Sequence, residues 1–334
     1  MSSALNQEPL AGMQVLLIPV TGAEVSSIWL DEVVRAVDPR HQVRFFEQSA
    51  PLAPQFKGVD VVVDQGGWGT RPMADAAAGI VRLWQILGVG VDHFDLAYWR
   101  SKAIPVANCP GSTSAAALAE HAFLLMLLLA RQFGVAQQRL QAGKLYEPMG
   151  SELQGKQLGL VGFGASAREL AHRALAFKMR VAAIDTQPIG ASVAAEYGLT
   201  LSGGTAELDD LIRTSDVLSL HVPLNESTLN LLDKRRLNLF KPDALLINVA
   251  RGPLVDEAAL AQALAEGRLG GAGLDVFSHE PPDPSSALIG MPNVVATPHI
   301  AGSTDGTARR RAQVVAENVR RLTMGQDPIF RVDT

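Results

Sequence analysis

Short apolar runs alternate with amphipathic segments along the first third of the chain. Apolar runs of roughly four to eight residues are typical of buried strands, whereas apolar residues spaced by three or four indicate helices. This pattern predicts strands at residues 14–20, 43–46, 59–63 and 83–87, with helices at residues 28–37 and 73–78. Strands that alternate with helices pair in parallel, because each helix carries the chain back to the same edge of the sheet.

The same alternation resumes after residue 155 and continues nearly to the end of the chain. It predicts strands at residues 157–161, 180–184, 217–221, 244–248, 271–275 and 293–296. Helices are predicted at residues 165–177, 208–213, 229–232, 257–266 and 304–322. The chain is therefore predicted to be an α/β protein with parallel sheets.

A strongly apolar segment lies between these two parts. A helix is predicted over residues 114–131, and residues 122–130 within it are apolar on every face. Such a helix must be covered on all sides, by its own domain or by a partner subunit. The apolar run is too short to cross a bilayer, which favours a buried helix. The more polar segment 132–153 is interpreted as an arm or linker.

Composition and charge narrow the class of protein. A chain of 334 residues, 47% hydrophobic and 19% charged, is typical of a globular protein with two domains. Its net charge of −5 favours neither nucleic acid nor an anionic membrane as a partner. The arginine run at residues 309–311 is interpreted as a solvated helix face. The start of the chain lacks the pattern of a signal peptide, and the one cysteine, Cys109, fits a reducing compartment, so we expect the cytoplasm.

A glycine-rich segment joins the predicted strand at 157–161 to the helix that follows. Gly162-Phe163-Gly164-Ala165-Ser166-Ala167 matches the dinucleotide fingerprint in which alanine takes the third glycine position. Gly162 would make the tight turn, Gly164 would let the backbone approach a pyrophosphate, and Ala167 would let the helix pack closely. The start of the helix would offer free N–H groups to the phosphates. A glycine motif alone also fits a plain tight turn.

The residue that ends the next predicted strand strengthens the nucleotide interpretation. Asp185 follows the strand at 180–184, about 20 residues after the glycine motif, where the fingerprint expects an acidic residue. Its carboxylate can accept hydrogen bonds from both ribose hydroxyls and would repel a 2′-phosphate. The sequence therefore predicts NAD rather than NADP as the cofactor.

Further motifs follow the glycine turn in a fixed order. They are His221-Val222-Pro223-Leu224, Asn248-Val249-Ala250-Arg251-Gly252, Gly273-Leu274-Asp275-Val276-Phe277, Glu280-Pro281 and Thr297-Pro298-His299-Ile300-Ala301-Gly302. The first part of the chain adds Gly88-Val89-Gly90-Val91-Asp92 and Ala119-Glu120-His121. In this order and at these spacings, the sequence resembles the D-isomer-specific 2-hydroxyacid dehydrogenase family over roughly residues 60–320.

The resemblance implies two Rossmann-like, doubly wound domains, one inserted into the other. Residues 1–105 and 302–334 would form a discontinuous substrate-binding domain, and residues 106–301 the NAD-binding domain, with the active site in the cleft between them. The implied activity is NAD-dependent interconversion of a small D-2-hydroxy acid and its 2-keto acid. The resemblance also points to a homodimer, in which a partner subunit would cover the apolar helix and arm over residues 114–153.

The chemistry of keto-acid reduction assigns roles to three residues at matching family positions. Arg251 is predicted to bind the substrate carboxylate and polarise the carbonyl, because a guanidinium binds carboxylates bidentately. His299 suits the proton donor, because the pKa of an ordinary histidine lies near neutrality. Glu280 would hold the imidazole and favour its protonated form. Taken singly, each residue has an ordinary structural interpretation; together they form a predicted catalytic group.

The resemblance assigns further residues to the cofactor and the substrate. The predicted cofactor-binding residues are Gly162, Gly164, Ala165, Ser166, Asp185, Val222, Pro223, Val249, Ala250, Asp275 and Gly302, with Asp275 meeting the nicotinamide carboxamide. The backbone amides of Gly88, Val89 and Gly90 would help Arg251 hold the substrate carboxylate. Trp68 fits either a wall of the substrate pocket or ordinary packing. No metal is expected, because the remaining histidines form no metal-binding spacing.

The chain departs from the family pattern at two places. Ala165 stands where the family often has an arginine that touches the pyrophosphate, so that contact is lost. The loop from Asn108 to Glu120 is about one residue longer than the expected pattern, which leaves the roles of Ser112, Thr113 and Ser114 open.

Two other functions stay open at the level of sequence. The family's fold also serves as an NAD(H)-sensing corepressor scaffold without enzymatic activity, which the three catalytic candidates argue against. A formate dehydrogenase of the same family is the second alternative, but such enzymes carry glutamine at the position of Glu280. Glycerate or hydroxypyruvate, glyoxylate, phosphoglycerate and lactate-like acids are all candidate substrates.

Overall fold

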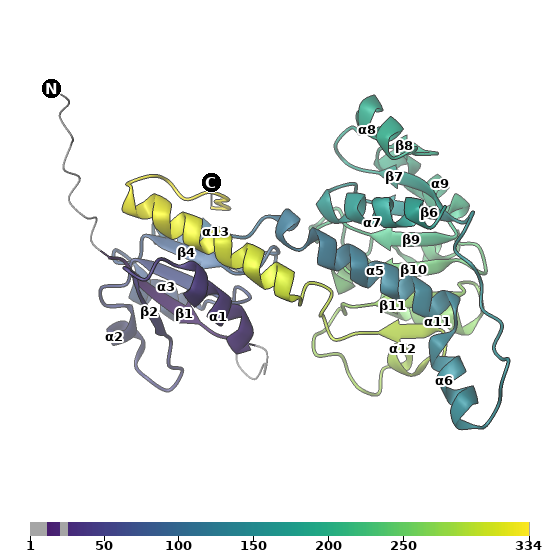
Figure 1. Ribbon diagram of the computed structural model, residues 1–334, viewed down its shortest axis with the longest axis horizontal. Helices are drawn as coiled ribbons and strands as arrows, with labels where there is room; N and C mark the ends of the chain where they lie inside the picture. The colour runs from purple at the N-terminus through teal and green to yellow at the C-terminus, as the bar shows by residue number, and fades with distance from the viewer. Residues whose placement is uncertain (1–11, 21–25, 334) are drawn as a thin grey trace. The chain divides into compact units, whose positions relative to one another are not determined.

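The computed structural model describes residues 12–20 and 26–333, which form two α/β units (Figure 1). The first unit takes the chain up to Thr113 together with the segment from Thr304 onward, and the second comprises Ser114–Ser303. Residues 106–113, placed in the NAD-binding domain by the sequence, lie in the first unit because β5 (Val106–Ala107) pairs with β4 (Leu83–Ile86). The N-terminal segment, for which we predict no signal peptide, lies outside the described residues.

The first unit is built on a five-stranded parallel sheet in the order β2-β1-β3-β4-β5. Its other strands are β1 (Gln14–Ile18), β2 (Gln42–Phe45) and β3 (Val61–Asp64). Its helices are α1 (Ser26–Ala36), α2 (Leu52–Phe56), α3 (Arg71–Ala77), α4 (Leu96–Ser101) and α13 (Asp305–Thr323). Alternate strand residues enter two separate apolar cores, so both faces of the sheet are covered.

The second unit contains a seven-stranded parallel sheet in the order β12-β11-β10-β9-β6-β7-β8. The strands are β6 (Gln157–Val161), β7 (Arg180–Ile184), β8 (Ser202–Gly203), β9 (Val217–Leu220), β10 (Leu245–Asn248), β11 (Gly271–Leu274) and β12 (Val294–Ala296). The helices are α5 (Ala115–Ala130), α6 (Phe133–Gln141), α7 (Ala165–Ala176), α8 (Ala191–Glu196), α9 (Leu208–Thr214), α10 (Lys234–Leu237), α11 (Glu257–Ala265) and α12 (Ala287–Gly290). Two apolar cores again cover both faces, which confirms the predicted doubly wound α/β fold.

The strand order of the second sheet indicates where a ligand would bind. The chain runs outward from β6 through β7 to β8, then returns to the other side of β6 to form β9. Open α/β sheets bind ligands at the carboxyl ends of the strands where the order reverses in this way. The glycine turn follows β6 directly and His221 follows β9, so both lie at this switch point.

The apolar helix α5 packs on the sheet of the second unit, as the sequence predicts for a buried helix. A Cβ on Gly273 of β11 would lie 2.8 Å from Cβ of Leu125, so only glycine lets α5 approach the strand this closely. The cover is incomplete, because Leu124 remains 47% exposed. Within the described residues, no helix by itself has the length and hydropathy to span a membrane; α5 and α6 meet those criteria only as a pair bent by 52°.

Two expectations about local structure are wrong. Residues 229–232 form a turn rather than a helix, because Asn230 adopts a left-handed backbone (φ +48°). The next helix, α10, begins only after its N-cap residue, Asp233.

The arginine run at 309–311 is not one solvated face. Arg309 is exposed, whereas Arg310 and Arg311 are partly buried and bind loops of the first unit.

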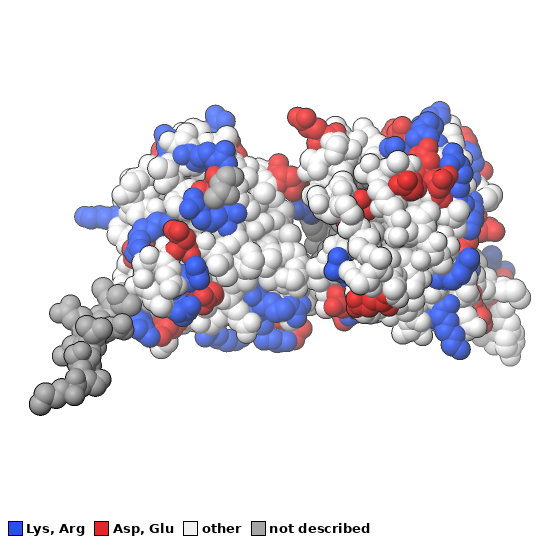
Figure 2. Space-filling model, turned by 90° about the horizontal axis from the view of Figure 1, so that it is seen from above, with Lys and Arg blue, Asp and Glu red and all other residues white. Residues whose placement is uncertain are grey.

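Charged side chains of both signs are mixed over the surface. On the face that Figure 2 shows, Lys and Arg lie beside Asp and Glu in both units. Many form ion pairs within their own unit, such as Arg235 with Asp209 and Arg320 with Glu317. This mixed surface agrees with the small formal net charge of the chain, −5.

Candidate active site

The carboxyl edge of the second sheet brings His299 and Glu280 together. Glu280 lies in the loop after β11, and His299 lies in the loop after the neighbouring strand β12. Nδ1 of His299 is 2.7 Å from Oε2 of Glu280. Because a carboxylate only accepts, Nδ1 carries the proton, and Nε2 is the atom left to exchange a proton with a substrate. The two side chains are 51% and 37% exposed, so a small molecule can reach them.

The surroundings of Glu280 keep it ionised. Burial by itself would raise the pKa of this carboxyl, but the hydrogen bonds from His299 and the Phe277 N–H outweigh it. The positive charges of His299 and Arg251 act in the same direction, so the pKa of Glu280 lies below its ordinary value. Near neutral pH, the imidazole therefore faces a negative charge.

A buried aspartate shapes the loop that carries His299. Asp275 is 1% exposed, and its carboxylate accepts hydrogen bonds from the N–H groups of Ile300 and Ala301 and from the Thr297 hydroxyl. Its carbonyl oxygen accepts the N–H of His299, 2.8 Å away. His299 has a left-handed backbone (φ +55°), which is uncommon for a residue other than glycine and clusters at functional sites.

The contacts of Asp275 bear on its predicted role at the nicotinamide. Its carboxylate oxygens bond to the loop after β12, so these contacts fix the loop that carries His299, and the role at the nicotinamide stays a prediction. His121 joins the same network from α5, with Nε2 2.9 Å from Oγ1 of Thr297 and 3.5 Å from Oδ1 of Asp275. The sequence assigned His121 no role beyond its place in a family motif. The Ala119-Glu120-His121 motif was the only sequence feature that could have drawn attention to it.

Arg251 lies at the same edge, after β10, which is the strand next to β11. Asn248 fixes this turn, because its side chain accepts from the N–H of Ala250 and donates to the carbonyl of Arg251. Gly252 follows, and a Cβ there would overlap the Phe277 carbonyl, so only glycine lets the two loops come this close. The sheet therefore brings Arg251, Glu280 and His299 to the carboxyl ends of three adjacent strands.

The glycine turn after β6 fits a dinucleotide pyrophosphate. Gly162 has φ +87°, and a Cβ there would lie 2.6 Å from the carbonyl oxygen of His221, so no larger residue fits. A Cβ on Gly164 would meet no atom within 4 Å, which leaves the start of α7 open. Open N–H groups at a helix start bind phosphate. Ala165 is the first residue of α7, so no side-chain cation stands at that position.

A partly buried histidine anchors this turn to the neighbouring strand. His221 is hydrogen-bonded through Nδ1 to the hydroxyl of Ser166 and through Nε2 to that of Ser219, both at 2.9 Å. Burial lowers the pKa of His221 to about 4, so the ring is neutral near pH 7. The hydroxyl of Ser166, a predicted cofactor contact, is thus engaged with the protein, while its backbone belongs to the open first turn of α7.

A hollow beside Asp185 suits the adenosine end of the cofactor. Its volume is about 300 Å³, and it is lined by Asp185, Thr186, Pro188, Ile189, Ser202, Gly203 and Gly204. Oδ2 of Asp185 accepts the N–H of Phe163 at 2.6 Å, which fixes the carboxylate next to the glycine turn. No lysine or arginine lines this hollow to offset the charge of Asp185. The site therefore fits a ribose with free hydroxyls better than one with a 2′-phosphate.

The other predicted cofactor residues also lie at the carboxyl edge of the second sheet. They follow β9, β10 and β12 in the chain: Val222 and Pro223, Val249 and Ala250, and Gly302. The side chain of Val249 is 4% exposed and belongs to the core, so only its backbone can face a ligand. These positions agree with a cofactor lying along the strand ends, which stays a prediction for each residue.

The predicted carboxylate loop lies in the first unit, after β4. The carbonyl oxygen of Gly88 accepts the N–H of Cys109 at 2.8 Å, and that of Val89 accepts Nδ2 of Asn108 at 2.6 Å. The nearby loop with Trp68 is held by the buried carboxylate of Asp64, which accepts the N–H groups of Trp68 and Gly69. The side chain of Trp68 is 63% exposed and its ring lies against that of His93, 4.7 Å between the ring centres, so both interpretations of Trp68 stay open.

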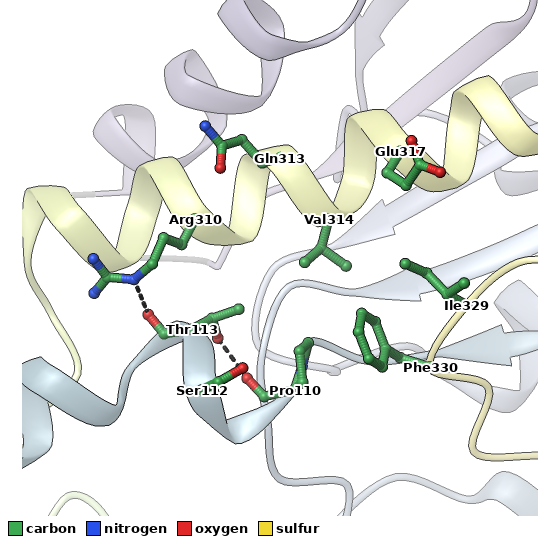
Figure 3. Close-up of a pocket in the computed structure, with 9 residues that line it drawn as sticks. All are labelled: Pro110, Ser112, Thr113, Arg310, Gln313, Val314, Glu317, Ile329 and Phe330. Carbon is green, nitrogen blue, oxygen red and sulfur yellow. Dashed lines mark hydrogen bonds between the residues drawn. The ribbon is translucent and has the colours of Figure 1, made fainter. Parts of the chain in front are cut away.

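A second hollow lies apart from the predicted site residues. It has a volume of about 330 Å³ in the first unit and is lined by Pro110, Ser112, Thr113, Arg310, Gln313, Val314, Glu317, Ile329 and Phe330. Figure 3 shows Arg310 of α13 reaching the carbonyl of Thr113, at 2.7 Å, while the Thr113 hydroxyl bonds to the carbonyl of Pro110. These contacts give Thr113 a structural role, because they hold the loop against α13, whereas Ser112 is exposed and only lines the hollow. Among the described residues, no group of three His, Cys, Asp or Glu side chains is placed to hold a metal ion.

Comparison with known families agrees with this geometry. The sequence model described as "D-isomer specific 2-hydroxyacid dehydrogenase, NAD binding domain" matches residues 123–301. That stretch is more than half of the chain and includes the glycine turn, Arg251, Glu280 and His299. The chain therefore belongs to the D-isomer-specific 2-hydroxyacid dehydrogenase family of oxidoreductases, and the second unit is its NAD-binding domain.

Relatives within the family differ in substrate. The hydroxypyruvate reductase of Thermotoga maritima is 40% identical over 267 residues, which cover 78% of this chain and 84% of that protein. The D-3-phosphoglycerate dehydrogenase of Archaeoglobus fulgidus is 37% identical over 71% of this chain, which spans only 44% of that protein. A solved D-2-hydroxyisocaproate dehydrogenase is 26% identical, with a TM-score of 0.82 over 96% of this chain and 100% of that one.

Proposed function

We propose that the protein interconverts a small D-2-hydroxy acid and its 2-keto acid with NAD as the hydride carrier. The observation that carries this proposal is the 2.7 Å pair of His299 and Glu280, at the same sheet edge as Arg251. An acid, its carboxylate partner and a guanidinium are the groups that reduction of a keto acid requires. A non-enzymatic NAD(H)-binding protein needs none of them.

The proposed mechanism divides the work among the residues of this chain. The bound dinucleotide supplies or accepts the hydride. Arg251 binds the substrate carboxylate and polarises the carbonyl, together with the backbone amides of Gly88, Val89 and Gly90. Nε2 of His299 gives its proton to the carbonyl oxygen during reduction and takes it back during oxidation. Glu280 holds the ring through Nδ1 and stabilises the imidazolium.

The decisive test of this function is turnover of 2-keto acids with NADH. Purified protein is assayed against hydroxypyruvate, glyoxylate, phosphohydroxypyruvate and pyruvate, with NADH oxidation followed by absorbance. We expect measurable turnover of at least one of them. The corepressor-like alternative would instead be supported if the protein binds NADH but neither reduces any keto acid nor oxidises any D-2-hydroxy acid with NAD. Turnover of formate alone would support the formate dehydrogenase.

The cofactor preference is predicted to be NAD over NADP. Asp185 accepts the Phe163 N–H beside a hollow without a lining cation, so a 2′-phosphate there would face an unbalanced negative charge. Asp185→Ser should raise the ratio of kcat/KM with NADPH to that with NADH by roughly tenfold to a hundredfold. Asp210→Ser, which removes an exposed carboxylate paired with Arg213, is the control and should leave the ratio unchanged. Equal use of NADPH and NADH by the unmodified protein would contradict this role of Asp185.

The pH profile of reduction is predicted to depend on Glu280. The pKa of Glu280 is held below its ordinary value, so its negative charge is present throughout the neutral range. In Glu280→Gln the protonated imidazole of His299 loses that partner and gives up its proton more readily. Keto-acid reduction should then decline at a lower pH than in the wild type, as measured by kcat from about pH 5 to 9, a range that includes the ordinary pKa of a histidine. Glu266→Gln removes a carboxylate paired with Arg268 at the surface and should keep the wild-type profile; the same profile for Glu280→Gln would contradict the proposed pairing.

We propose a homodimer formed through the second unit. Apolar side chains stay exposed along α6 and the segment after it, which project beyond the helices that cover the sheet (Figure 1); Leu140 is 60% exposed, Leu145 64% and Met149 91%. Exposed apolar surface of this kind marks an interface. Light scattering should give twice the chain mass of 35.5 kDa. The pair Leu140→Asp and Leu145→Asp should give a monomer, whereas Met324→Asp, 49% exposed on the first unit, should not. A monomer in the wild type at micromolar concentration would contradict the proposal.

The proposed location is the cytoplasm. The chain has one cysteine, Cys109, and its side chain is fully buried. Burial raises the pKa of its thiol to about 12, so it is uncharged and unreactive near neutral pH. A lone, inert thiol is compatible with a reducing compartment, where the dinucleotide and small keto acids also meet.

A further inference from the structure

Three consecutive arginines on α13 have three different surroundings. Successive residues of a helix are rotated by about 100° from one another, so Arg309, Arg310 and Arg311 cannot share one face. Arg309 is exposed and pairs with Asp305, and Arg310 bonds to the carbonyl of Thr113. Arg311 turns toward the interior of the first unit, where Nη1 donates to the carbonyl oxygen of Leu87 at 3.2 Å.

The charge of Arg311 is not balanced within its unit. Its guanidinium lies over the ring of Trp29, 5.1 Å from the ring centre, and its Nε is buried without a hydrogen-bond partner. No carboxylate pairs with it in the part of the chain that the structure describes. The titratable group beside it is Cys109, whose thiol is neutral because burial raises its pKa to about 12. Removing a cation from water without a nearby anion costs free energy, which points to a function for the charge of Arg311.

Arg311 contacts the loop that is predicted to hold the substrate carboxylate. The carbonyl of Leu87 and the N–H of Gly88 belong to one trans peptide, so they point in opposite directions. With the carbonyl held by Arg311, the N–H of Gly88 points away from the guanidinium. The next two carbonyls, of Gly88 and Val89, are held by the N–H of Cys109 and by Asn108, which turns the N–H groups of Val89 and Gly90 away from those donors.

These contacts prepare the loop for an anion. Among the described residues, none accepts a hydrogen bond from the N–H of Gly88, Val89 or Gly90. A donor on the carbonyl of a peptide polarises its N–H, and a charged donor does so more strongly. Consecutive backbone N–H groups without acceptors form a concave anion site. Arg311 thus orients and polarises the N–H of Gly88 and places a positive charge near one such site.

We infer that Arg311 is a positioning residue for the substrate carboxylate, acting from behind the loop through the Leu87–Gly88 peptide without touching the substrate. This inference rests on the proposed function, because the carboxylate is that of the 2-keto acid. It concerns binding rather than proton transfer, since the acid–base pair of His299 and Glu280 lies in the other unit. Removing the charge should therefore act on KM for the keto acid and leave the affinity for NADH unchanged.

The experiment compares Arg311→Met with Arg309→Met in the full-length protein. Methionine keeps an apolar stem against Trp29 but removes the charge and the donor. We expect Arg311→Met to raise KM for glyoxylate and hydroxypyruvate by about tenfold, the loss expected for a hydrogen bond from a charged group, with a smaller change in kcat. Arg309→Met, which loses only a surface ion pair, should keep the wild-type KM. Arg311→Lys retains a charge on a flexible stem, and its KM should lie between those of the wild type and Arg311→Met.

A binding measurement separates this inference from the proposed function. Oxamate, a carboxylate that resembles pyruvate but is not reduced, is titrated into each protein with NADH bound, with nucleotide fluorescence as the readout. Weaker oxamate binding by Arg311→Met, with unchanged NADH affinity, would support the inference even without turnover. Wild-type oxamate binding and KM in a folded Arg311→Met or Arg311→Lys would overturn it while leaving the proposed function intact. If the wild type neither binds oxamate nor reduces a keto acid, the proposed function fails and the inference fails with it.

Discussion

Replacing His299 with asparagine should lower kcat for the best 2-keto acid by roughly a hundredfold to ten-thousandfold, the usual contribution of a positioned acid. Asparagine cannot donate a proton to the developing alkoxide, but it tolerates the left-handed backbone of this position, φ +55°. The loop fixed by Asp275 should therefore keep its shape. The affinity for NADH, measured by fluorescence titration, should stay nearly unchanged, because the nucleotide hollow lies after β7.

A neighbouring histidine provides the matched control for this variant. His279 is exposed and precedes Glu280 directly, so His279→Asn makes the same chemical change beside the site without removing the proposed donor. It should keep wild-type kcat. If His299→Asn also keeps near-normal kcat on the best keto acid, another group must supply the proton, and the mechanism built on the His299–Glu280 pair is wrong.

The fold could be predicted largely because its central strands are apolar runs long enough to show a period. Residues 157–161 and 217–221 were predicted within one residue of β6 and β9. The two-residue strands β5 and β8 were missed, since a run of two residues carries no periodicity and their pairing depends on neighbours far away in sequence. The false helix at 229–232 arose from leucines at a helical spacing, which the left-handed Asn230 interrupts.

The candidate site could be predicted less completely from local pattern. The glycine turn and Asp185 could be recognised from their own spacing, and the family's NAD-binding domain covers both, while their individual contacts with NAD stay predictions. His299 and Glu280 were paired only through the family resemblance, because no spacing along the chain shows that the loops after β11 and β12 meet. The contacts of His121 and Arg311 could not be predicted from the sequence. Each depends on which way a helix faces, and that is decided by packing.

Replacing Arg251 with lysine should raise KM for the keto acid and lower kcat together, with kcat/KM falling by roughly a hundredfold. An ammonium keeps the charge but cannot form the two parallel hydrogen bonds that a guanidinium makes with a carboxylate. The surrounding turn should persist, because Asn248 holds it through backbone groups of Ala250 and Arg251.

The measurement is steady-state kinetics with the keto acid varied at saturating NADH, followed by the reverse titration of NADH. Arg213→Lys, at an exposed ion pair with Asp210, is the control for the same substitution and should match the wild type. A change in KM for NADH alone would place Arg251 at the cofactor rather than at the substrate. Unchanged kcat and KM for the keto acid would remove it from the mechanism, since every step proposed for Arg251 acts on the bound carboxylate or carbonyl.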